Sequence, residues 1–262
     1  MSGMLPAAVL LFLISDPQAA IDHERAGRVY EGKGELQKAA VEYEEAVQLS
    51  PYEESYYFEA AHVRLLLKQF DAAERVLERG CKVFDKSAQL ELALGVAYYG
   101  ERRFGDAAGA FLRTIDLAPD VRQPYVFLSK MMDQSADRVP EILPRFEKWA
   151  ASNSDDAQAQ FVYAKGILAS NGDAVKAEEL LRTSIRLKAD QWESHYELGA
   201  LLEKQRRFRD AAAELERSIA LSPNQADAHY HLSRVYDRLG EPAKAAEQRE
   251  IHSRLTAPGG IK

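Results

Sequence analysis

The 262-residue sequence predicts an all-α solenoid built from antiparallel helix pairs. Three observations support this fold class. The segment 92–119 contains two amphipathic helical patterns joined by a short polar turn at 100–103. The same residue spacing returns at a fixed interval along nearly the whole chain. No segment shows the alternation of apolar and polar residues that is typical of a half-buried strand.

The segment 92–119 shows how one helix pair is expected to pack. In its first half, Leu94, Gly95 and Tyr98 share one helix face, so that face has a gap between bulky residues. In its second half, Ala107 and Phe111 lie four residues apart and also share a face. We expect the second helix to pack with this face against the gap in the first.

Copies of this segment recur with a period of thirty-four residues. Stepping back from Gly95 reaches Ala61 and then Gly27, and later copies are centred on Gly199 and Ser233. A proline closes three of the copies, as Pro51, Pro119 and Pro223. The predicted units are 20–53, 54–87, 88–121, 122–157, 158–191, 192–225 and 226–257.

This spacing resembles the tetratricopeptide repeat (TPR), whose signature is an LG..Y trio, an A...F pair and a closing proline. The resemblance covers about seven tandem repeats and implies a right-handed superhelical solenoid of antiparallel helix pairs. In such a solenoid each repeat contacts only its neighbours, so the chain is expected to form one elongated domain.

Residues 1–19 differ from the repeats. Ala7 to Ile14 is a continuous apolar run of about the length of a signal-peptide core, but Met1 to Pro6 contains no Lys or Arg. Three interpretations remain open: a cleaved export signal, an uncleaved anchor, and a helix that caps the first repeat. We prefer the export signal, which places the protein in an exported or periplasmic compartment rather than the cytoplasm.

The unit 122–157 is the aberrant one. Tyr125, Leu128 and Met132 are expected to continue its first helix, whereas Pro140 and Pro144 fall where its second helix should run. The unit is interpreted either as a degenerate repeat or as a hinge between the segments 20–121 and 158–257. In the next unit Lys165 replaces the expected small residue, which indicates a register that is off by one. The tail 258–262 has no packing face and is expected to be disordered.

Composition and motifs argue against several function classes. The net charge of -7 and the interleaved acids and bases are unlike a nucleic-acid surface. The sequence contains no HExxH, P-loop or GxSxG motif, and its single cysteine, Cys81, has no obvious base nearby. His195 and His229 occupy equivalent repeat positions and are interpreted as packing residues rather than metal ligands. We therefore expect no enzyme, no cofactor and no metal.

The TPR resemblance implies a concave groove lined by the first helix of each repeat. It implies binding of a peptide or an amphipathic helix of a protein partner, with no nucleic acid, and membrane contact only through an uncleaved N-terminal segment. The alternatives are inter-repeat packing for part of the strip, an RNA-binding helical repeat, or an adaptor subunit of an enzyme complex. The expected partner-binding residues are Phe58, His62, Leu65, Leu92, Val96, Tyr99, Val126, Lys130, Tyr196, Tyr230 and Arg234. Further groove positions are Glu24, Arg28, Val162, Gly166 and Ala200.

Overall fold

The computed structural model describes residues 16–257, and within this range every regular element is helical. The predicted all-α fold class is thus confirmed. The chain forms two compact units, and the boundary between them lies between Arg138 and Val139. This boundary falls inside the aberrant segment 122–157. That this segment acts as a hinge stays a prediction.

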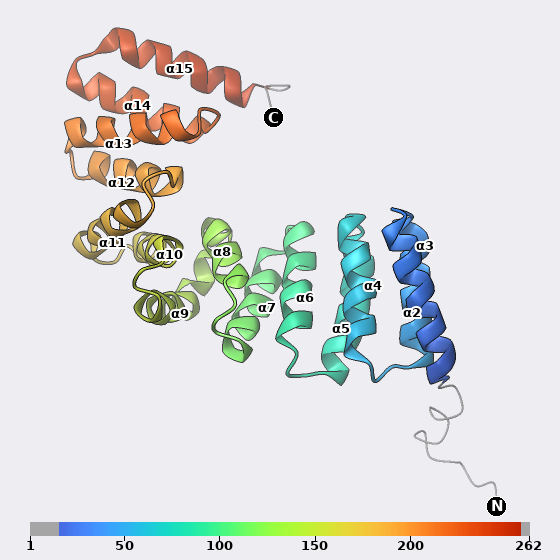
Figure 1. Cartoon of the computed structure of the whole chain (residues 1–262). Helices are drawn as coiled ribbons and strands as arrows, with labels where there is room; N and C mark the ends of the chain where they lie inside the picture. Colours follow the sequence, from blue (N-terminus) through green and yellow to red (C-terminus); the bar gives the residue numbers. More distant parts are fainter. Residues whose placement is uncertain (1–15, 258–262) are drawn as a thin grey trace, which may run out of the picture. The chain divides into compact units, whose positions relative to one another are not determined.

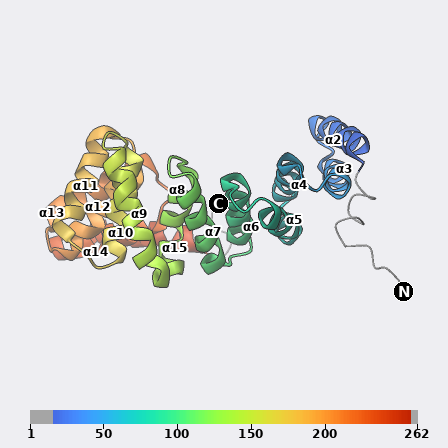
Figure 2. The same ribbon diagram turned by 90° about the horizontal axis from the view of Figure 1, so that it is seen from below.

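Unit 1 stacks its helix pairs in chain order, and each helix packs on the next one (Figures 1 and 2). Its elements are α2 (Pro17–Gly32), α3 (Leu36–Leu49), α4 (Glu54–Leu66), α5 (Phe70–Val83), α6 (Ala88–Gly100), α7 (Phe104–Leu117), α8 (Gln123–Lys130) and the 3-10 segment η1 (Met132–Arg138).

Unit 2 has the same construction. Its helices are α9 (Val139–Ser152), α10 (Ala157–Ala169), α11 (Ala174–Leu187), α12 (Trp192–Lys204), α13 (Phe208–Leu221), α14 (Ala226–Leu239) and α15 (Pro242–Thr256). None of the helices described in either unit is both long and apolar enough to cross a membrane. The predictions for residues 1–15 and for the tail 258–262 lie outside the described residues.

The first described helix begins at Pro17, earlier than the predicted unit boundary at Ala20. Asp16 caps this helix, because its side-chain oxygen accepts a hydrogen bond of 3.0 Å from the backbone N–H of Ala19. Pro17 follows at the first helical position, where a missing N–H costs nothing. The two residues together set the start of α2.

In three of the described helix pairs a bulky side chain packs on a glycine sixteen positions earlier. A Cβ added to Gly95 would lie 2.5 Å from Phe111, and one added to Gly27 would lie 2.7 Å from Tyr43. The same contact recurs in unit 2, where Gly199 lies against Leu215. The gap predicted at Gly95 therefore receives Phe111, and the two helices approach closely because no side chain separates them.

Outside the aberrant repeat, the turn inside each described helix pair contains one residue with a left-handed backbone. Gly34, Lys68 and Arg102 have φ of 74°, 56° and 61° and are spaced by the repeat period. In the repeat at 158–191 the corresponding residue is Asn171, with φ of 51°. It lies one position earlier than the period predicts, because the following turn contains one extra residue before α11 begins at Ala174.

That shift corrects the predicted groove positions of α10. Its small packing residue is Ala164, which is fully buried, and Lys165 takes the position expected for Gly166. Val162 is fully buried and Gly166 packs against Leu143 and Phe146 of α9. Val162 and Gly166 are therefore wrong as groove residues, because the extra turn residue rotates α10 by one position.

The aberrant repeat has a shorter first helix than predicted. α8 ends at Lys130, and Met132 begins the 3-10 segment η1 rather than continuing the α-helix. Ser135, inside η1, has a non-helical backbone, and its hydroxyl donates a hydrogen bond of 2.8 Å to the carbonyl of Met131. The second helix, α9, nevertheless forms, with Pro144 inside it. The break thus lies before the prolines and not at them.

Candidate functional site

Six of the predicted apolar residues on the first helices of unit 1 keep part of their side chains exposed. They are Phe58 and Leu65 of α4, Leu92, Val96 and Tyr99 of α6, and Val126 of α8, and we call this set the α4–α6–α8 surface. All six side chains are half-buried, whereas the residues that hold the helix pairs together are fully buried. The six residues therefore pack at their bases and still present apolar area to solvent.

The ring of Tyr99 is held in place by aromatic neighbours. It lies edge-on to Phe127, with ring centroids 5.3 Å apart, and Phe127 in turn stacks on the core residue Phe111 at 5.0 Å. Tyr99 also contacts Phe104 at 5.8 Å. These contacts connect the exposed surface to the core of the α6–α7 pair, so the surface is preformed.

Paired charges border this surface on the side of α2. Arg28 forms ion pairs with Glu24 and with Glu59, the latter at 3.0 Å. Burial raises the pKa of Glu59 above its usual value, and the neighbouring Arg28 opposes that rise. His62 stacks on Phe58 with ring centroids 5.8 Å apart and is exposed.

At the other border, Lys130 is exposed at the end of α8. The α4–α6–α8 surface is therefore an apolar strip between two charged borders.

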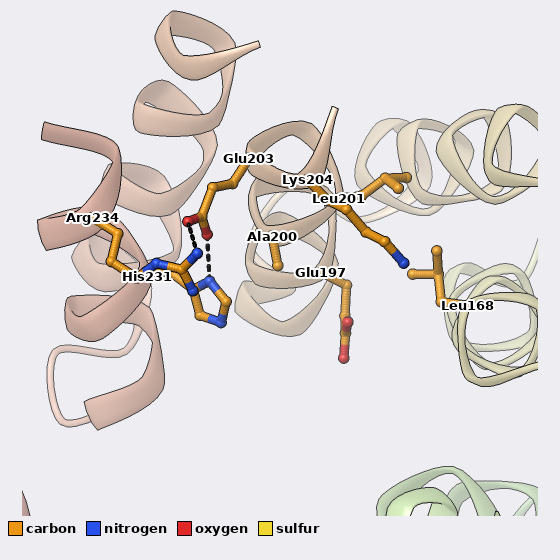
Figure 3. A pocket seen from close by; sticks show the side chains of 8 residues that line it. All are labelled: Leu168, Glu197, Ala200, Leu201, Glu203, Lys204, His231 and Arg234. Carbon is orange, nitrogen blue, oxygen red and sulfur yellow. Dashed lines mark hydrogen bonds and ion pairs between the residues drawn. The ribbon is translucent and has the colours of Figure 1, made fainter. Parts of the chain in front are cut away.

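In unit 2 the first helices form a polar pocket of about 390 Å³ (Figure 3). We call it the α12–α14 pocket; its lining residues are Leu168, Glu197, Ala200, Leu201, Glu203, Lys204, His231 and Arg234. Glu203 holds its two basic neighbours in place, because its carboxylate is 2.6 Å from Nδ1 of His231 and 3.1 Å from Nη2 of Arg234.

Four of the predicted groove residues lie at this pocket, where Ala200 and Arg234 line it and Tyr196 and Tyr230 border it. Tyr196 and Tyr230 each lie edge-on to His231 with ring centroids 5.7 Å away, and the Arg234 guanidinium lies 5.6 Å from the Tyr230 ring. Glu203 was not predicted from the sequence, although it lies at the repeat position of Leu65 and Tyr99. That shared position was the signal that could have found it.

His195 and His229 form separate, equivalent polar contacts. His195 Nδ1 is 2.7 Å from the Glu214 carboxylate, and its Nε2 is 3.2 Å from the carbonyl of Ala189. His229 makes the matching pair of contacts within the next repeat, with Gln248 and Pro223. Across residues 16–257 no group of three or more potential ligands could hold a metal ion. Both histidines join a helix pair to the loop before it.

Family models of the tetratricopeptide repeat match residues 23–53, 58–121 and 196–250, which is more than half of the chain. The chain belongs to the tetratricopeptide repeat family. The TPR assignment agrees with the period and with the glycine contacts described above.

Solved TPR structures share the fold. A tetratricopeptide repeat protein from Parabacteroides merdae superposes with a TM-score of 0.69 at 12% identity, covering 92% of this chain and 94% of that one. YrrB, described as a TPR protein with an unusual peptide-binding site, superposes with a TM-score of 0.57 at 14% identity, covering 72% and 96%. At these identities the likeness shows the fold alone.

Two curated relatives match at the sequence level. Protein O-mannosyl-transferase TMTC3 of Homo sapiens is 24% identical over 64% of this chain, and the Mus musculus protein is 26% identical over 61%. The aligned part of this TPR chain spans about a fifth of the length of either relative.

Proposed function

We propose that this TPR protein is a non-enzymatic interaction module that binds an amphipathic helix or an extended peptide of a protein partner on its first helices. The α4–α6–α8 surface is the primary contact. The α12–α14 pocket, with Tyr196, Tyr230 and Arg234 around it, supplies a second, polar contact.

The single observation that carries this proposal is the half-exposed apolar strip on α6. Leu92, Val96 and Tyr99 recur at i, i+4 and i+7, so they form one stripe along the helix. Phe58 and Leu65 extend the apolar area on α4, which packs beside α6. Contiguous apolar area on a protein surface is typical of an interaction site, and a stripe of this kind suits the apolar face of a partner helix.

The fold supports the proposal in a general way. YrrB, which shares the fold, is described as having a peptide-binding site. A shared fold gives only the backbone scaffold, and the side chains on its surface determine which ligand binds. The borders at Arg28 and Lys130 bear charge, which suits a partner helix with an apolar centre and polar ends.

The test uses the full chain as bait for a random peptide library displayed on phage, followed by fluorescence anisotropy on synthetic versions of the selected peptides. The test variant combines Leu92→Glu, Val96→Glu and Tyr99→Glu. We expect it to lose at least about tenfold in affinity, because three buried apolar contacts would be replaced by hydrated charges.

A matched control combines Tyr52→Glu, Val83→Glu and Leu117→Glu. These apolar residues of unit 1 are 69%, 41% and 39% exposed and lie away from the first-helix surface. The control introduces the same charge, and circular dichroism verifies that both variants remain helical. Equal peptide affinity of the test variant and the wild type would refute the proposal.

A further inference from the structure

A second pocket lies in unit 1 on the side of the second helices. It has a volume of about 350 Å³ and is lined by Glu44, Val47, Gln48, Arg64, Ala72, Arg75, Val76 and Arg79. These residues come from α3, α4 and α5, which pack on one another in chain order (Figure 1). We call it the arginine pocket. Neither the groove prediction nor the proposed function uses it.

The arginine pocket is basic, although the protein as a whole is acidic. Three arginines and one glutamate line it, which gives a local formal charge of +2 in a chain whose net charge is -7. Val47 and Val76, which are 2% and 7% exposed, form an apolar floor.

Arg64 departs from the pattern of the other repeats. The same position holds Tyr98 in the third repeat and Tyr236 in the seventh, and each hydroxyl donates a hydrogen bond to a glutamate of the preceding helix pair. Arg64 keeps that contact: its Nε donates to Glu44 over 2.7 Å, and its Nη1 donates to Gln69 over 2.7 Å. These bonds fix the guanidinium, and among the described residues its Nη2 has no partner.

The other two arginines are available to a ligand. Arg79 forms no ion pair with any carboxylate in residues 16–257; its neighbour is the hydroxyl of Tyr57. Arg75 pairs over 3.1 Å with Asp71 one turn earlier on α5, and the two side chains are 69% and 72% exposed. Exposed pairs of this kind contribute little stability, so an anion can replace Asp71 at small cost.

We propose that the arginine pocket binds a phosphoryl group, carried either by a soluble phosphate compound or by a phosphorylated side chain of a partner. A phosphoryl group carries about -1.5 to -2 charge at neutral pH, which matches the local +2. Guanidinium groups donate pairs of parallel hydrogen bonds to its oxygens, whereas a single carboxylate would leave half of the local charge uncompensated. The apolar floor accommodates the carbon atoms next to the phosphoryl group.

The experiment titrates the full-length protein with inorganic phosphate at pH 7.5 and follows backbone amide shifts by NMR. We expect saturable shifts in the amides of α3 and α5. The double substitution Arg75→Gln and Arg79→Gln should weaken binding by about tenfold or more, because two charge-assisted donors are lost. Both side chains are exposed, so the helices should remain intact.

The matched control is Arg217→Gln. Arg217 occupies on α13 the repeat position that Arg79 occupies on α5, is also exposed, and lines no described arginine-rich pocket. This control should bind phosphate as the wild type does. A loss of equal size in the control, or phosphate shifts that never saturate, would overturn the proposal, as would unchanged binding by the double variant.

A second titration, with a short phosphoserine peptide, identifies the source of the phosphoryl group. Affinity at least about tenfold above that of inorganic phosphate, and lost in the same double variant, assigns the pocket to a phosphorylated partner. Equal affinities assign it to a soluble phosphate compound. Neither result depends on the α4–α6–α8 surface, because the triple glutamate variant of that surface retains all three arginines.

Discussion

Gly95 of α6 lies so close to the ring of Phe111 of α7 that a Cβ at residue 95 would come within 2.5 Å of the ring atom Cε1. Both residues are buried, and the ring has no room to move, because it also stacks on Phe127 at 5.0 Å. Gly95→Ala should therefore lower the free energy of unfolding by about 1–3 kcal/mol, since overpacking displaces the helix pair.

The control for that prediction is Gly105→Ala on α7. Nothing lies within 4 Å of a Cβ at residue 105, so this change should be neutral or stabilising, by up to about 1 kcal/mol. Denaturant unfolding followed by circular dichroism compares the two variants. Equal stability of the two would contradict the packing account of Gly95.

The left-handed backbone of Gly34 gives a second prediction, about the stability of two glycine variants. Gly34 has φ of 74°, whereas Gly32, at the end of α2, does not have a positive φ, and a Cβ added to either glycine would have no neighbour within 4 Å. Gly34→Ala should destabilise the protein by about 1 kcal/mol through backbone strain alone, whereas Gly32→Ala should not. Thermal unfolding of both variants tests this, and a stabilised Gly34→Ala protein would show that the turn is not left-handed.

His195 and His23 occupy the same repeat position and make the same carboxylate contact, at 2.7 Å in both cases. His195 differs in being buried and in its additional contact with the carbonyl of Ala189. His195→Leu should therefore cost about 1–3 kcal/mol, because a part-buried hydrogen bond to the carbonyl of Ala189 is lost together with the Glu214 contact, while His23→Leu should cost less than about 1 kcal/mol. Urea unfolding of the two variants measures the difference, and equal costs would refute the role of the Ala189 contact.

Alkaline pH should destabilise the protein. Burial, aided by the nearby Glu78, raises the pKa of Tyr98 to about 12 and also raises the pKa values of Tyr43 and Tyr236. A phenol whose pKa is higher in the folded state stabilises it fully below the unfolded-state pKa of about 10, and loses that contribution as pH rises toward the folded value.

Melting temperatures measured between pH 8 and 12 test this. Tyr98→Phe should weaken the decline above pH 10, whereas Tyr52→Phe should leave it unchanged, since Tyr52 is 69% exposed. A decline that is identical in the wild type and in Tyr98→Phe would show that this phenol does not contribute.

Cys81 should react slowly with thiol reagents. Burial, with a further contribution from Glu91, raises the pKa of its thiol to about 12, so almost no thiolate is present at pH 8. Labelling with Ellman's reagent should be slow in the native protein and fast in guanidinium chloride. Complete native labelling at the rate of the unfolded chain would contradict the burial of this side chain.

The repeat period and the contacts within each helix pair could be predicted from the sequence, because both ends of these contacts lie in one short segment. Gly95 and Phe111 are sixteen residues apart. A small residue on one helix and a large residue on the next predict a packing contact between the two helices. The fold class, the family and the position of the aberrant repeat follow from such local patterns. The half-exposed side chains of α6 were likewise predictable from helical periodicity.

Which residues share a surface between repeats depends on how the helices of neighbouring repeats pack in the folded chain. One extra residue after Asn171 rotates α10, buries Val162 and brings Lys165 and Leu168 beside α12 instead. The arginine pocket likewise joins residues of three helices, and the pairing of Glu203 with His231 spans two repeats. A rotation or a contact of this kind depends on which turn contains an extra residue. The periodic pattern of side chains is nearly the same whether or not a turn contains one, so the pattern alone does not reveal the arrangement.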